Sequence, residues 1–127
     1  MKFKTIFIVA IVIYFVFGLA FILFPEFAIM RFSNESALST STQYIVRWWG
    51  AALLGLGATL LFSLKASPDS IGMRALYIGH GVGHGLHFFV GLADIIRSSP
   101  KPTIWIMMVY WFVMTILFGL LAFKKKA

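Results

Sequence analysis

The chain has 127 residues, of which 61% are hydrophobic and 12% charged, and its mean hydropathy is +0.94. A soluble domain of this length could not bury so much apolar surface, so the composition predicts an integral membrane protein. The absence of cysteine excludes disulfides and thiol chemistry, and the net charge of +7 does not indicate nucleic-acid binding because the basic residues lie at the ends of apolar runs.

Four stretches without Asp, Glu, Lys or Arg predict four membrane-spanning helices in an all-α fold, since a helix needs about 20 mostly apolar residues to cross a bilayer. The predicted helices span approximately residues 4–24, 44–64, 69–93 and 102–123. Short connectors after the second and third helices make these helices antiparallel neighbours. We therefore expect one transmembrane domain over residues 1–127, folded as an up-down four-helix bundle.

The connectors contain residues that typically start and stop helices. Pro25 ends the first predicted helix, and the run Ser39-Thr40-Ser41-Thr42 supplies N-cap candidates for the second. Ser67-Pro68-Asp69 places a cap, a proline and an acid where the third helix begins. The long connector, residues 26–43, is either a short amphipathic turn in the membrane interface or an ordinary loop.

The distribution of lysine and arginine predicts that both termini lie on the cytoplasmic side of the membrane. We expect this membrane to be a bacterial or archaeal cytoplasmic membrane. With the N-terminus inside, seven basic residues are cytoplasmic: Lys2, Lys4, Lys65, Arg74, Lys124, Lys125 and Lys126. Four are external: Arg31, Arg47, Arg97 and Lys101. We expect the first segment to remain as a helix rather than to be cleaved as a signal peptide, because its apolar run continues through Phe24.

The third predicted helix carries all three histidines of the chain, His80, His84 and His87. At about 100° per residue they fall within an arc of about 60° on one face, and Asp94 lies on the same face closer to the helix end. Because polar groups are costly in lipid, this face is expected to point to the bundle interior, a partner or a water-filled cavity.

Several chemistries suit this histidine face. Histidines at i and i+4 can chelate copper or zinc, and one histidine can be an axial ligand of heme. A quinone-like ligand or a proton relay would need only hydrogen bonds, for which Tyr14, Tyr77 and Tyr110 are candidate partners. The alternative is a structural polar seam between helices. Gly79 and Gly83, in small-xxx-small spacing, and Gly81 and Gly85 on the other flank would allow close approach to the face.

On the second predicted helix, Arg47, Ala51 and Gly55 share one face, which predicts helix packing along Ala51 and Gly55. Arg47 and Asp94 are expected near the same membrane surface, where they either form an ion pair or Arg47 reaches lipid phosphates. These features predict that the second and third helices form the close-packed pair, with the first and fourth as largely lipid-facing walls.

Pro25, the run Arg47-x-x-Gly50-Ala51-Ala52-Leu53-Leu54-Gly55-Leu56-Gly57 and the sequence Arg74-Ala75-Leu76 resemble small bacterial four-helix membrane proteins, the DoxX-like and related families. The resemblance implies a four-helix bundle and no settled activity, and it transfers no functional residue to the histidine face.

The leading functional hypothesis is a membrane-embedded binding protein or small complex subunit, with the site residues His80, His84, His87 and Asp94 open to the outer side. Its ligand would be copper, zinc, heme or a quinone-like molecule, and a homo-oligomer or a larger complex is expected. The alternatives are a structural accessory subunit and an oligomeric proton-coupled transporter. An enzyme is less favoured, because the serines on the inner side have no base nearby.

Overall fold

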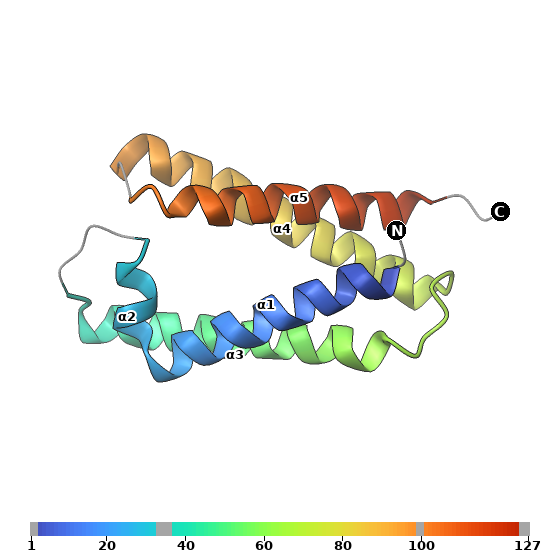
Figure 1. Ribbon diagram of the computed structural model, residues 1–127, viewed down its shortest axis with the longest axis horizontal. Helices are drawn as coiled ribbons and strands as arrows, with labels where there is room; N and C mark the ends of the chain where they lie inside the picture. Colours follow the sequence, from blue (N-terminus) through green and yellow to red (C-terminus); the bar gives the residue numbers. More distant parts are fainter. Residues whose placement is uncertain (1–2, 33–36, 99–100, 125–127) are drawn as a thin grey trace. The chain divides into compact units, whose positions relative to one another are not determined.

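The computed structural model describes residues 3–32, 37–98 and 101–124, and all regular secondary structure in these ranges is helical, which confirms the all-α prediction. The helices are α1 (Phe3–Leu23), α2 (Pro25–Met30), α3 (Thr40–Ser63), α4 (Ile71–Ser98) and α5 (Ile104–Phe123) (Figure 1).

Three of the described helices, α1, α3 and α5, are long and apolar enough to cross a membrane, which supports an integral membrane protein. The hydroxyls of Thr59, Ser63 and Thr115 each donate to a carbonyl of their own helix at 2.7 Å, as expected for polar groups in apolar surroundings. The longest helix, α4, has 28 residues but contains glycines, histidines and charged residues, so its crossing of the membrane stays a prediction.

Pro25 and Ser39, two of the predicted start and stop residues, lie at helix boundaries in the structure. α1 ends at Leu23, and Pro25 begins a separate short helix, α2, that the sequence did not separate from the connector. Ser39 is the N-cap of α3, and its side chain accepts from the Thr42 amide at 3.2 Å. α4 starts later than predicted: its cap is Ser70, whose hydroxyl accepts from the Met73 amide, rather than Ser67.

The chain divides into two compact units, Met1–Lys65 and Ala66–Ala127, and each is described by itself. In the first unit α1 packs along α3, with α2 beside them (Figure 1). A Cβ atom on Gly50 would lie only 2.6 Å from the carbonyl oxygen of Gly18 in α1, so the two backbones meet where only glycine fits. Phe21, Ala28 and Val46 form a buried cluster that joins α1, α2 and α3.

In the second unit α4 and α5 form an antiparallel helical hairpin. Two contacts show the antiparallel register of these helices. Arg74 contacts the carbonyl of Ala122 near one end of the hairpin, and Gly91 lies next to Met108 near the other end. α1 and α5 are thus each half of a packed pair, and the expectation that the first and fourth predicted spans are mainly lipid-facing walls stays a prediction for the faces that this packing leaves open. Pairing of the second and third spans, which belong to different units, stays a prediction.

Candidate functional site

The histidine face of α4 packs against aromatic side chains of α5. His80 is stacked on Phe118, with 5.1 Å between ring centroids and 20° between ring planes. His84 lies on the same Phe118 ring at 5.8 Å and 19°. His80 is 7% exposed, His84 is 4% exposed and Phe118 is fully buried, so this stack is an interior part of the structure. The prediction that polar groups on α4 turn away from the surface therefore holds for these two histidines.

Tyr110 of α5 adds a second ring contact to His84. The two rings meet edge to face, with centroids 5.4 Å apart and 89° between planes. The Tyr110 hydroxyl is buried and has no hydrogen-bond partner among the described residues. Tyr110, one of the three tyrosines that the sequence offers as partners for the histidines, thus contacts His84 through its ring.

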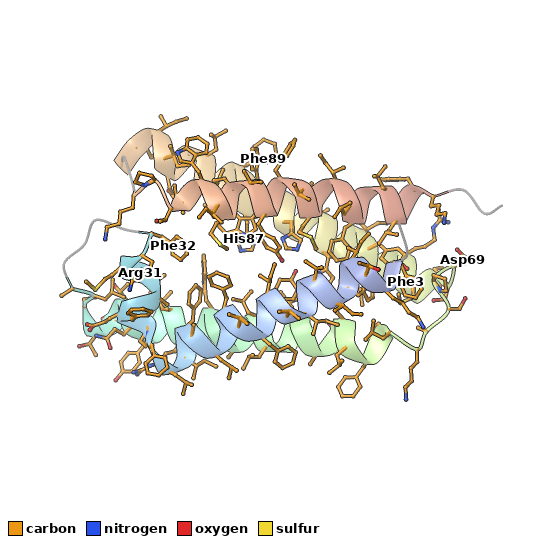
Figure 2. The ribbon with its side chains drawn as sticks, in the orientation of Figure 1. Phe3, Arg31, Phe32, Asp69, His87 and Phe89 are labelled. Carbon is orange, nitrogen blue, oxygen red and sulfur yellow. The ribbon has the colours of Figure 1, made fainter. Side chains whose placement is uncertain are left out.

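His87, which Figure 2 labels on α4, differs from the other two histidines because its side chain is exposed. Its ring lies against Trp111 of α5, with centroids 5.4 Å apart. Its Nδ1 atom is 2.7 Å from the carbonyl oxygen of Gly83. A carbonyl only accepts, so in the neutral ring Nδ1 carries the proton and donates it, and Nε2 is the atom with a lone pair.

Glycines set the distance between the two helices of the hairpin. A Cβ atom on Gly81 would lie 3.6 Å from Cβ of Phe118, and one on Gly85 would lie 3.6 Å from Cγ2 of Thr115. Gly91 is tighter still, with 2.7 Å between its added Cβ and the sulfur of Met108. The flank of the histidine face that carries Gly81 and Gly85 therefore accepts the close approach of α5.

The predicted packing positions on the other flank have different surroundings. A Cβ atom added to Gly79, Gly83 or Gly55 would meet no atom within 4 Å, and Ala51 is exposed. Tight glycine contact in the first unit instead involves Gly50 and Gly57, which lie on another face of α3. A packing role for Gly79, Gly83, Ala51 and Gly55 stays a prediction. Their packing partner would be a helix outside the unit to which each residue belongs.

No group of three or more His, Cys, Asp and Glu side chains in the described ranges is placed to hold a metal ion. The centroids of His80 and His84 are 6.4 Å apart and their planes are tilted by 34°. Two imidazoles that bind one tetrahedral zinc through nitrogens at about 2.0–2.1 Å bring their centroids to roughly 5 Å from each other. The arrangement in α4 suits ring stacking better than chelation.

The charged residues of the predicted site are distributed over both units. Asp94 is exposed on α4, towards the end of the helix, and Arg47 is exposed on α3 in the other unit, so their ion pair stays a prediction. Arg74, assigned from the sequence only as a topology residue, donates to the carbonyl of Ala122 through Nε at 3.4 Å and Nη2 at 3.3 Å. Arg74 therefore supplies donors at the C-terminal end of α5.

Comparison with known proteins gives no assignment for this arrangement. No family model matches the chain, and no curated protein and no solved structure matches it. The resemblance to DoxX-like proteins therefore remains one of sequence pattern.

Proposed function

We propose that this protein is a small membrane-embedded binding protein, or a small subunit of a membrane complex, that holds a planar ligand at His87. The observation that carries the proposal is the 2.7 Å contact between Nδ1 of His87 and the Gly83 carbonyl on an exposed side chain. This contact orients the ring, and in the neutral tautomer that it favours the lone pair is on Nε2, the atom that would bind the ligand.

The surroundings of His87 support a flat ligand. Trp111 lies against one side of the imidazole and holds it in place. Gly79 and Gly83 are on the neighbouring flank of α4, where an added Cβ atom would meet nothing within 4 Å. A planar ring system can approach a helix backbone closely at such positions, because no side chain stands in its way.

The same geometry narrows the ligand class. One histidine is enough to hydrogen-bond a quinone carbonyl or to be one axial ligand of heme. Both the quinone carbonyl and Nε2 of the neutral ring are acceptors, so a water molecule that donates to both would join them. Binding of copper or zinc by His80, His84 and His87 together is not favoured, because two of the rings are stacked on Phe118. A second axial heme histidine would have to come from a second copy of the chain.

In this proposal α4 also crosses the membrane, as the third of four spans in an up-down bundle with both termini in the cytoplasm. Its buried histidine face is covered by α5, which removes the cost of exposing His80 and His84 to lipid. His87 and Asp94 would then be reached from the outer side, in a bacterial or archaeal cytoplasmic membrane. The protein would work as a homo-oligomer or within a larger complex.

Purification in a mild detergent tests the proposal. We expect either a heme absorbance spectrum or an isoprenoid quinone in the organic extract, and saturable binding of added hemin or a short-chain quinone. His87→Leu should abolish binding, whereas His80→Phe, which keeps the stacked ring, should retain it. The proposal is contradicted if no ligand copurifies and neither added hemin nor added quinone binds. It is also contradicted if His87→Leu binds the ligand as well as the unchanged protein does.

The structural alternative is favoured by a specific observation: His80 and His84 use their ring faces for packing on Phe118. In this case the protein is an accessory subunit, and the open flank with Gly79 and Gly83 packs against another protein. Copurification with a larger complex that is lost on Gly79→Leu or Gly83→Leu, without any ligand, would support this alternative over the first.

A further inference from the structure

The short helix α2 is held firmly at the end of the α1–α3 pair. Pro25 and Ala28 are buried, and Ala28 packs with Phe21 and Val46. Nε2 of Gln43 donates to Oε1 of Glu26 at 2.9 Å, which ties the first turn of α2 to α3. The side of α2 that faces α1 and α3 is therefore fixed by both apolar packing and a hydrogen bond.

The opposite side of α2 exposes large apolar rings next to a positive charge. Phe24 is 61% exposed and Phe27 is 62% exposed. The guanidinium of Arg31 lies over the Phe27 ring, with 4.4 Å from Cζ to the ring centroid. The first turns of α3 add exposed Tyr44, Trp48 and Trp49, and the exposed Arg47 between them.

Exposed aromatic rings beside arginine side chains are typical of the surface where a protein contacts phospholipid headgroups. Tryptophan and tyrosine are enriched where membrane helices leave the hydrocarbon, and arginine there reaches lipid phosphates. The rings continue the apolar surfaces of α1 and α3, both of which are long and apolar enough to cross a membrane. The carboxylate of Glu26 accepts from Gln43, so a neutral amide donor lies beside it.

We propose that α2 lies in the membrane interface as a fixed lipid anchor. Phe24 and Phe27 enter the boundary between headgroups and acyl chains, and Arg31 and Arg47 bind phospholipid phosphates. In this proposal α2, which follows the first span, is a lipid-binding element rather than part of an aqueous loop. This proposal does not depend on the histidine face or on its ligand.

Site-directed spin labelling tests the proposed depth, and the chain is suited to it because it contains no cysteine. Phe27→Cys carries the label at the proposed interface, and Phe24→Cys is a second probe in case the first variant folds poorly. Val12→Cys, exposed in the middle of α1, is the deep reference, and Ser67→Cys, exposed in the connector before α4, is the aqueous reference. Each protein is reconstituted in vesicles of phosphatidylcholine and phosphatidylglycerol.

Accessibility to oxygen and to a water-soluble nickel chelate reports the depth of each label. We expect the labels at positions 27 and 24 to fall between the references, several-fold less accessible to nickel than the label at position 67. Accessibility equal to that at position 67 would place α2 in water and overturn the proposal. Shielding from both reagents would mean that protein covers α2, and would overturn it equally.

The phosphate contact has its own test in the Phe24→Cys background. Arg31→Gln should move the label towards water, with a several-fold rise in nickel accessibility, whereas Arg31→Lys, which keeps the charge, should leave it nearly unchanged. An unchanged depth in Arg31→Gln would overturn the role of Arg31 in binding phosphate.

Discussion

The imidazole of His80 lies nearly parallel to the ring of Phe118, with centroids 5.1 Å apart and 20° between the planes. The same phenyl ring is stacked with His84 at 5.8 Å. One fully buried side chain of α5 thus contacts two of the three histidines of α4. The two buried histidines of α4 are accommodated because their rings pack face to face on an aromatic ring.

Removal of the shared ring should destabilise the hairpin of α4 and α5. Phe118→Ala leaves a cavity between two histidines and loses both stacking contacts, so we expect a loss of about 3 kcal/mol in the free energy of unfolding. Phe118→Leu keeps much of the volume and should lose about 1 kcal/mol, the contribution of the ring pairs. Circular dichroism during titration with dodecyl sulfate in mixed micelles measures both. Equal unfolding of Phe118→Ala and the unchanged protein would contradict the role of the stack.

Replacement of each histidine by phenylalanine separates packing from ligand binding. In His80→Phe and His84→Phe a ring of similar shape remains on Phe118, so the free energy of unfolding should change by less than about 1.5 kcal/mol. Ligand binding should survive in His80→Phe and be lost in His87→Phe, because His87 is the histidine of α4 whose side chain is exposed. Titration of hemin or a short-chain quinone, together with the unfolding curves, gives the two readouts. Equal binding loss in both variants would mean that the stack itself holds the ligand.

The sequence predicted the histidine face well because helix periodicity places His80, His84 and His87 on one side whatever surrounds the helix. It could not predict that Phe118 and Tyr110 cover this face. α5 is apolar on all sides, so nothing in its pattern distinguishes the side that packs from the side that faces lipid. The packing of α5 buries His80 and His84 and leaves His87 exposed, and the periodicity of α4 contains no information about this difference.

The glycines show the same limit. α3 carries small residues on two faces, Gly50 and Gly57 on one and Ala51 and Gly55 on the other, and small-residue spacing marks both as able to approach another helix. The structure brings Gly50 against α1, which the sequence treated as a wall. The helix starts were easier to predict, because a cap such as Ser39 acts within its own turn and depends little on the rest of the fold.

Loss of the arginine contact should weaken the C-terminal end of α5. Arg74 donates to the Ala122 carbonyl, one of the carbonyls that the helix itself leaves unpaired, so Arg74→Ala should cost about 1 kcal/mol. Arg97→Ala, which removes an exposed arginine from the last turn of α4, is the matched control and should cost less. The rate of trypsin cleavage at the Lys124–Lys126 run reports fraying of this end. No difference between the two variants would show that the contact contributes nothing to stability.

Two glycines of α3 provide the sharpest test of how α1 and α3 are packed. An added methyl on Gly50 would lie 2.6 Å from the carbonyl of Gly18, so Gly50→Ala must push the helices apart, and we expect a loss of about 1–3 kcal/mol. A methyl on Gly55 meets nothing within 4 Å, so Gly55→Ala should be neutral or should gain up to about 1 kcal/mol from helix propensity.

Unfolding in mixed micelles compares these two alanine variants with the unchanged protein. The order expected from the structure is Gly55→Ala most stable and Gly50→Ala least stable, because only the second change disturbs an existing backbone contact. A loss in Gly55→Ala as large as that in Gly50→Ala would instead indicate that the face with Ala51 and Gly55 packs against a helix outside the first unit. That outcome would support the packing role that the sequence pattern predicts for these two residues.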